Sequence, residues 1–225
     1  MKIAMIGTGY VGLVSGICFS DFGHSVVCVD KDLQKIDLLN SGKVSIYEPG
    51  LDALMAKNVA AGRLSFSQDL QAAIDGADAA FIAVGTPTRR GDGHADLQYV
   101  MAAAEEIAQA ARDYLVVVTK STVPVGTNRQ VKQLIRKTVP SLEFDVASNP
   151  EFLREGAAIE DFMKPDRVMI GVQTERAAEV MAEIYRPLYL RDFPIITTDL
   201  ESAEMTKYAA NAFLATKISF INEIA

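Results

Sequence analysis

Short apolar runs alternate with longer amphipathic segments along most of the chain. The runs read as strands buried on both faces, and they cover Lys2–Ile6, Ser25–Val29, Ala79–Val84, Tyr114–Thr119, Phe144–Ala147, Arg167–Val172 and Pro194–Thr197. Between them, apolar residues recur at helical spacing over Tyr10–Phe22, Lys31–Asn40, Leu51–Ala60, Leu97–Arg112, Thr127–Lys137 and Glu175–Tyr185. This alternation predicts a doubly wound α/β fold, a mostly parallel sheet with helices on both faces.

Local residues refine the element boundaries. Gly23 is placed to end the first helix in a left-handed conformation, and Asp96 is placed to cap the helix that begins at Leu97. The glycine-rich, polar stretch 89–94 indicates a mobile loop after a strand. Leu200–Ala225 contains no Gly or Pro and reads as one long helix without a stop signal, so we expect the chain to end within a helix.

Composition narrows the class of protein. The chain has 225 residues, 49% hydrophobic and 23% charged, which fits one large globular domain with an appendage and excludes a disordered chain. Its net charge of −7 argues against nucleic acid or an anionic membrane as the main partner. Glycines interrupt the apolar N-terminus, and nowhere do 18 apolar residues run together, so we expect a cytoplasmic protein without a membrane segment.

The two cysteines, Cys18 and Cys28, lie ten positions apart inside a predicted helix and a predicted strand. They form no C-x-x-C pair, and only two histidines accompany them in the whole chain. We therefore expect no disulfide framework and no metal site, and we interpret both thiols as small buried hydrophobic groups in a reducing compartment.

The first predicted strand is followed directly by Gly7-Thr8-Gly9-Tyr10-Val11-Gly12, a G-x-G-x-x-G sequence that opens the first helix. Gly7 permits a tight turn, Gly9 lets a pyrophosphate approach the backbone, and Gly12 lets helix and strand pack closely. In this strand-turn-helix setting the motif predicts a Rossmann-like dinucleotide site, although an ordinary strand-to-helix turn remains the alternative.

Asp30 supports the dinucleotide interpretation. It ends the second predicted strand, eighteen positions after Gly12, where a carboxylate accepts from the adenosine ribose 2′-hydroxyl. The alternative is that Asp30 caps the helix that starts near Lys31. A carboxylate at this point would repel a 2′-phosphate, so the sequence favours NAD over NADP, despite Lys31 and Lys35 nearby.

Polar residues follow three later strands, at the edge where ligands bind in such sheets. They lie in Val84-Gly85-Thr86-Pro87-Thr88, Lys120-Ser121-Thr122 and Asn149-Pro150-Glu151-Phe152-Leu153-Arg154-Glu155-Gly156. If the last stretch is helical, Glu151 and Glu155 share a face and suit general base work; otherwise they are solvated acids. On the long helix, Lys207 and Asn211 lie one turn apart and suit stabilisation of an oxyanion, although surface Lys and Asn are common.

Together with Glu48-Pro49-Gly50-Leu51, Val123-Pro124-Val125-Gly126-Thr127 and Ala209-Ala210, these motifs resemble the nucleotide-sugar 6-dehydrogenase family in order and over the whole chain. The resemblance is greatest to members that act on UDP-glucose. It implies NAD-dependent oxidation of UDP-glucose to UDP-glucuronate, with two successive hydride transfers from sugar C6 through an aldehyde and a cysteine thioester.

The resemblance also implies roles for residues. Glu151 would be the acid/base of thioester hydrolysis with Thr122 helping to place the water, and Lys207 with Asn211 would stabilise the oxyanion. Phe152, Leu153, Glu155, Lys207 and Asn211 would contact the UDP-sugar substrate. The cofactor contacts would be Gly7, Gly9, Tyr10, Val11, Gly12, Asp30, Lys35, Gly85, Thr86, Pro87, Ser121, Thr122 and Glu155.

The resemblance covers the family's N-terminal portion: an NAD-binding domain over residues 1–198 and the start of a central connecting helix over 199–225. Family members carry the catalytic cysteine beyond that helix, so neither Cys18 nor Cys28 is assigned this role, and we expect the stretch alone to be inactive. The full-length protein is expected to be a homodimer. GDP-mannose and UDP-N-acetyl-mannosamine remain alternative substrates, and a stand-alone, non-catalytic NAD-binding module is the alternative from another class.

Overall fold

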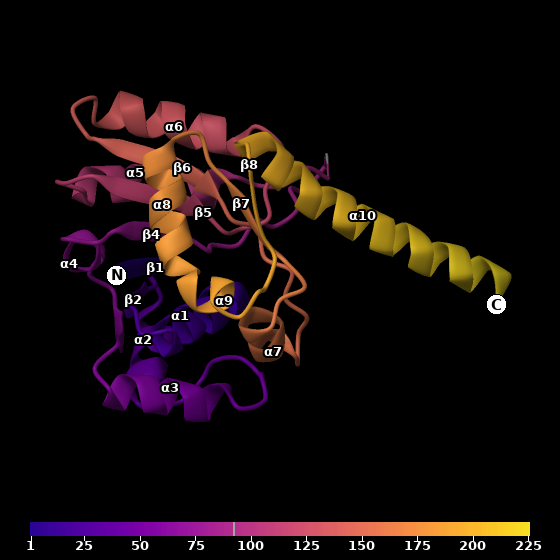
Figure 1. The fold of residues 1–225 in the computed structure, drawn as a ribbon, viewed down its shortest axis with the longest axis horizontal. Coiled ribbons are helices and arrows are strands. Elements are labelled where there is room, and N and C mark those ends of the chain that lie inside the picture. The colour runs from indigo at the N-terminus through magenta and orange to yellow at the C-terminus, as the bar shows by residue number, and fades with distance from the viewer. Residues whose placement is uncertain (92) are drawn as a thin grey trace.

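The computed structural model describes residues 1–91 and 93–225. In this part of the chain one sheet contains eight strands in the order β3-β2-β1-β4-β5-β6-β7-β8 (Figure 1). The strands are β1 Lys2–Ile6, β2 Ser25–Val29, β3 Leu64–Ser67, β4 Ala79–Ile82, β5 Leu115–Thr119, β6 Phe144–Ser148, β7 Val168–Gly171 and β8 Ile195–Thr198. All neighbours are parallel except β6 and β7, which meet at the antiparallel pair Ser148 and Gly171. The doubly wound, mostly parallel sheet is therefore confirmed.

The helices connect these strands. They are α1 Tyr10–Asp21, α2 Leu33–Asn40, α3 Leu51–Ala60, α4 Leu70–Ile74, α5 Gln98–Ala110, α6 Thr127–Thr138, α7 Ala158–Met163, α8 Glu175–Ile184, α9 Arg186–Tyr189 and α10 Leu200–Ile224. Seven of them follow the periodicity of the sequence within three residues at each end; the short helices α4, α7 and α9 and strand β3 were not predicted.

Two hydrophobic cores lie on opposite faces of the sheet. Along β1, Ile3 and Met5 pack into the core with α1, α2, α3, α7 and α8, whereas Ala4 and Ile6 pack into the core with α4, α5 and α6. Successive side chains of a strand point to opposite faces, so an uninterrupted apolar run is what a sheet covered on both sides requires. The exposed middle of β8 departs from this expectation, because Ile196 lies on the edge strand and is 42% exposed.

Helix boundaries follow local chemistry with small corrections. Gly23 has a φ of +101°, as expected for a left-handed residue after α1. Helix α5 begins one residue later than expected, with Leu97 at its N-cap, although Asp96 still accepts from the Gln98 N–H at 3.0 Å. Of the predicted loop 89–94, Asp92 lies outside the described residues; the flanking Thr88 and Ala95 pair in an antiparallel bridge.

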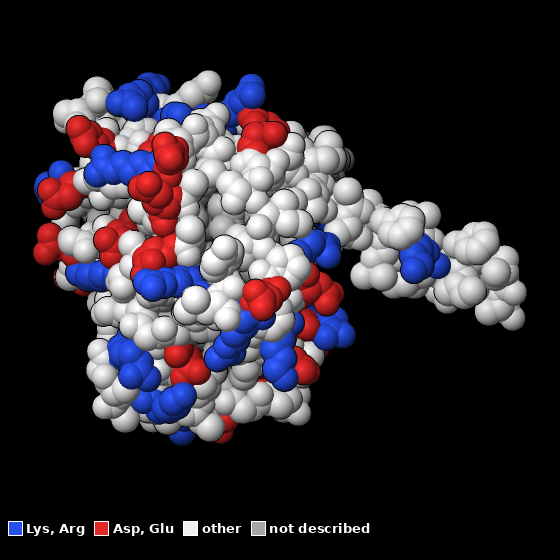
Figure 2. Space-filling view, viewed as in Figure 1, with Lys and Arg blue, Asp and Glu red and all other residues white. Residues whose placement is uncertain are grey.

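Helix α10 leaves the body of the molecule and projects away from it (Figure 1). Its first turns pack on β6 and β7, where Leu200 and Ala203 are fully buried. Beyond Lys207 every described residue is exposed or half-buried, and the surface is mainly uncharged (Figure 2). Within the described residues, no helix has both the length and the apolar character to cross a membrane.

Candidate functional site: a dinucleotide cleft beside a buried ion pair

The glycine turn 7–12 lies at the switch point of the sheet, between β1 and β4, where the order of the strands reverses. Gly7 has a φ of +100°, and a Cβ there would lie 2.7 Å from the Ala83 carbonyl oxygen at the end of β4. A Cβ on Gly12 would lie 2.0 Å from the Gly7 oxygen, so no side chain fits at either position. A Cβ on Gly9, in contrast, would meet nothing within 4 Å. The turn is closed toward the protein and open above Gly9, as backbone contact with a ligand requires.

Asp30 is held beside this turn. Its Oδ2 accepts from both the N–H (2.8 Å) and the hydroxyl (2.7 Å) of Thr8, and its Oδ1 accepts from the Asp32 N–H at 3.0 Å. Burial alone would raise its pKa, but the hydrogen bonds from Thr8 and Asp32 and the charge of Lys35 outweigh burial and lower it. Asp30 is therefore an ionised acceptor. The N-cap of α2 is Asp32, so the alternative role of Asp30 as that cap is wrong.

A cavity of about 690 Å³ opens beside Asp30 and the glycine turn. Its lining includes Gly9, Asp30, Lys35, Val84, Gly85 and Tyr99. A pyrophosphate binds at an open glycine and the start of a helix, as at Gly9 and α1. A ribose binds to a carboxylate at the end of the second strand, as at Asp30. The residues present therefore fit an adenine dinucleotide.

The loops after β4 and β5 are tied together next to this cavity. The Thr86 hydroxyl donates to the Thr122 carbonyl oxygen at 3.0 Å, and the Ser121 hydroxyl donates to the Val84 carbonyl oxygen at 2.7 Å. Thr86 and Thr122 also line a second cavity of about 550 Å³, together with Tyr208 and Asn211 of α10. The structure thus brings three predicted site residues, Thr86, Thr122 and Asn211, to one space.

Glu151 and Lys207 form an ion pair at the same sheet edge. The Lys207 Nζ lies 2.9 Å from Glu151 Oε1, and the Leu153 N–H donates to Glu151 Oε2 at 2.6 Å. Both side chains are about nine-tenths buried, with 9% and 11% exposed. The segment after Asn149 is irregular, so Glu151 and Glu155 do not share a helix face as the helical interpretation supposed.

Two cations contact the Phe152 ring. The Arg167 guanidinium lies 4.3 Å from the ring centroid, and the Lys207 Nζ lies 5.3 Å from it. Helix α10 is held in place one turn earlier by Glu204, which accepts from the N–H groups of Gly126 and Asn128 at 2.6 and 2.8 Å. This buried carboxylate fixes the first turns of α10, and hence the position from which Lys207 reaches Glu151.

Lys120 follows β5 at the expected sheet edge, but its side chain is buried. The sequence placed it on the ligand edge, but the structure buries it to 3% exposure, with its Nζ donating to Asn149 Oδ1 at 3.1 Å. Burial lowers its pKa to about 8, although the charge of Glu151 opposes the shift. With Asn149, Glu151, Arg154 and Tyr185 it lines a cavity of about 500 Å³.

Neither cysteine belongs to this site. Cys18 and Cys28 are fully buried and unpaired, as interpreted from the sequence. Burial raises the pKa of both thiols, that of Cys28 to about 12. Each thiol is therefore protonated at neutral pH, and neither is a nucleophile.

The fold and the cleft define a dinucleotide-binding domain of the Rossmann class. Comparison with known proteins specifies it further. Residues 1–189 match the NAD binding domain of the UDP-glucose/GDP-mannose dehydrogenase family, and residues 201–225 match the central domain of that family. The chain belongs to the UDP-glucose/GDP-mannose dehydrogenase family and contains its NAD-binding domain.

Individual proteins similar to this chain carry names from the same family. The chain is 63% identical to the UDP-glucose 6-dehydrogenase of Rhizobium meliloti over the whole chain and 52% of that protein, and 54% identical to UDP-glucose 6-dehydrogenase TuaD of Bacillus subtilis over 48% of that protein. A UDP-glucose dehydrogenase structure from Pyrobaculum islandicum superposes with a TM-score of 0.94 at 44% identity, over 99% of this chain and 51% of that one. A ternary complex of a GDP-mannose dehydrogenase from Pseudomonas aeruginosa also gives 0.94, at 42% identity, over 99% and 52%. The chain spans about half the length of the curated relatives it matches.

Proposed function

We propose that this chain is the NAD-binding half of an enzyme that oxidises UDP-glucose to UDP-glucuronate. The observation that carries the proposal is the Glu151–Lys207 pair, which lies at the carboxyl edge of the same sheet whose switch point carries the dinucleotide cleft. NAD, when bound, supplies the hydride acceptor for sugar C6. The identities to UDP-glucose 6-dehydrogenases favour UDP-glucose as the sugar nucleotide.

In this proposal the backbone at Gly7, Gly9, Tyr10, Val11 and Gly12 holds the pyrophosphate, and Asp30 with Lys35 holds the adenosine ribose. Gly85, Thr86, Pro87, Ser121, Thr122 and Glu155 complete the cofactor contacts. These groups hold and orient the cofactor, and Thr122 has a second role on the substrate side.

The substrate side consists of Phe152, Leu153, Glu155, Lys207 and Asn211. The Lys207 ammonium and the Asn211 amide donate to an oxyanion that develops at C6. Lys207 is nine-tenths buried, and a fixed positive charge is worth most where water is excluded. Glu151 moves a proton to or from a water molecule that Thr122 helps to place. The ion pair with Lys207 holds the Glu151 carboxylate at the position where this proton transfer is needed.

The test is an assay of the full-length enzyme with NAD and each sugar nucleotide in turn. The proposal predicts two NADH formed per UDP-glucuronate, identified by mass spectrometry. GDP-mannose and UDP-N-acetyl-mannosamine serve as competing substrates, because structures named as dehydrogenases of both superpose on this chain. Faster oxidation of either one would reject UDP-glucose as the substrate, and NAD binding without any oxidation would indicate a non-catalytic module.

We further propose that residues 1–198 form the NAD-binding domain, that 199–225 begin a central helix, and that the full-length protein is a homodimer. The exposed apolar side chains of α10, which include Phe213, Ile218 and Ile221, support a partner along this helix. The two free thiols suit a cytoplasmic location. The chain's net charge of −7 favours neither nucleic acid nor an anionic membrane as a partner.

A further inference from the structure

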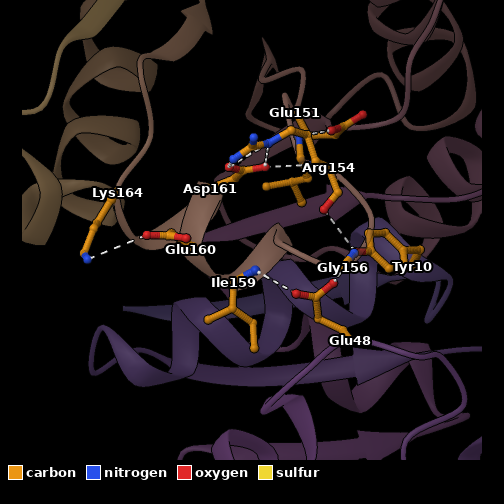
Figure 3. A network of polar contacts seen from close by, with 10 residues as sticks. Tyr10, Glu48, Glu151, Arg154, Gly156, Ile159, Glu160, Asp161 and Lys164 are labelled. Carbon is orange, nitrogen blue, oxygen red and sulfur yellow. Dashed lines mark hydrogen bonds and ion pairs between the residues drawn. The ribbon is translucent and has the colours of Figure 1, made fainter.

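Glu48, in the loop before α3, lies at the centre of a contact between the glycine turn and the loop that carries Glu151 and Glu155. It is 6% exposed, and both of its carboxylate oxygens are used (Figure 3). Oε2 accepts from the Tyr10 hydroxyl and from the Gly156 N–H at 2.9 Å, and Oε1 accepts from the Ile159 N–H at 3.4 Å.

Tyr10 connects this contact to the cofactor side. Its backbone opens α1 directly after Gly9, while its hydroxyl reaches Glu48 and also receives the Gly156 N–H at 3.1 Å. Burial, the hydrogen bond to Glu48 and the charges of Glu48 and Glu155 raise the pKa of Tyr10 to about 12. The phenol is therefore protonated and acts as a donor to the Glu48 carboxylate.

The segment that Glu48 holds is also joined to α10 by the Glu151–Lys207 ion pair and to α7 by Arg154. The Arg154 N–H and guanidinium bind Asp161 of α7, with the Nη2 of Arg154 2.6 Å from Asp161 Oδ1 (Figure 3). That contact joins the segment only to its own neighbour in the sequence. The contacts of Glu48 join it to an element 108 residues away in the chain, and so they decide where the segment lies relative to the glycine turn.

We propose that Glu48 is a positioning residue: through Tyr10 and the Gly156 and Ile159 N–H groups, it fixes the loop bearing Glu151 and Glu155 against the dinucleotide turn. Glu48 touches neither cofactor nor substrate in this role. Its effect on turnover rests on the proposed function, whereas its effect on the loop does not. A carboxylate is needed because all three partners are donors, and Gln offers one acceptor oxygen in place of two.

The experiment compares wild type with Glu48→Gln, with Tyr10→Phe and with the matched control Asp52→Asn, an exposed acid four residues away in the first turn of α3. Amide hydrogen exchange of this chain is followed by NMR with and without NAD. Loss of a hydrogen bond to a charged acceptor should speed exchange at Gly156 and Ile159 by about ten- to a hundredfold in Glu48→Gln. Tyr10→Phe should act on Gly156 more than on Ile159, and Asp52→Asn should leave both amides unchanged.

Exchange at Gly156 and Ile159 that is unchanged in Glu48→Gln would overturn the proposal. Acceleration that is equal in the β5 amides would also overturn it, because it would assign Glu48 only a general role in stability. In the full-length enzyme, we expect Glu48→Gln to lower kcat about tenfold while KM for NAD changes less than threefold; a change in KM alone would contradict positioning. The exchange arms need no turnover, so they test Glu48 even if the enzyme oxidises a different sugar nucleotide.

Discussion

Replacing Asp30 with Asn should change the choice between NADH and NADPH. Oδ2 of Asp30 is occupied by two donors of Thr8. Among the described residues Oδ1 accepts only from the Asp32 N–H, which leaves a second acceptor site for a ribose hydroxyl. A hydrogen bond from this hydroxyl to a carboxylate is worth about 1.5–3 kcal/mol. We therefore expect NADH to bind roughly ten- to a hundredfold more weakly to Asp30→Asn.

NADPH should respond in the opposite direction, because the substitution removes a negative charge that faces its 2′-phosphate. The assay is fluorescence titration of both reduced cofactors, with thermal unfolding of each variant measured alongside. Asp32→Asn is the matched control: Asp32 caps α2 through the Gln34 N–H and lies outside the cavity lining, so this variant should lose stability but keep the cofactor ratio. An unchanged NADH to NADPH ratio in Asp30→Asn would refute the role of this carboxylate.

Three other outcomes follow from the site and from α10. In the full-length enzyme, Glu151→Gln and Lys207→Ala should each lower kcat by about 10²–10⁴-fold with a much smaller effect on UDP-glucose binding; steady-state kinetics would contradict these roles if KM alone rises. The pKa of Lys120 is about 8 in the folded chain and about 10.4 unfolded, so the unfolded state binds more protons between these values. Denaturant titrations should show wild type gaining roughly 3 kcal/mol relative to Lys120→Met as the pH rises from 8 to 10.5, and a constant difference would mean that Lys120 is not desolvated. Sedimentation should show self-association of this chain through α10, where Phe213 is 67% and Ile221 is 55% exposed, and Phe213→Glu with Ile221→Glu should disperse it; an unchanged sedimentation coefficient would place the contact elsewhere.

The sequence predicts an element of this fold well where its hydrophobic pattern extends over the whole element. The strand β1 and the helix α3 begin and end where their patterns predict, because runs of buried residues and helical spacing each cover a full element. Strand β3 is only Leu-Ser-Phe-Ser, and α4 has five residues, so neither carries enough periodicity to be recognised.

In the candidate site, too, residues in a local pattern could be predicted, whereas contacts between distant positions could not. Gly7, Gly12 and Asp30 were recognised because a fixed spacing connects them to one strand-turn-helix unit. Glu151 and Lys207 were each singled out, but the ion pair between them joins positions 56 residues apart, and no local pattern encodes such a contact. Glu48 and Glu204 were given no role for the same reason: their partners lie 38 to 111 residues away.

The burial of the Lys120 side chain could not be predicted from the sequence. Its position after a strand predicts an edge residue, and that part is right, since its backbone N–H bonds the Ile82 carbonyl oxygen at 2.9 Å. The side chain turns inward because Asn149 and Tyr185, from two other segments, provide an acceptor oxygen and a hydroxyl in the interior. Only the packed structure shows that this cation lost its contact with water.

A crystal structure of this chain with NAD would locate the dinucleotide in the fold. We expect the pyrophosphate to lie over Gly9 at the start of α1, and a ribose hydroxyl to lie within hydrogen-bond distance of Asp30 Oδ1. The adenine should occupy the cavity of about 690 Å³ beside Gly85 and Tyr99. A dinucleotide found instead in the cavity of about 500 Å³ beside Lys120 and Tyr185, or one without contact to Asp30, would contradict this expectation.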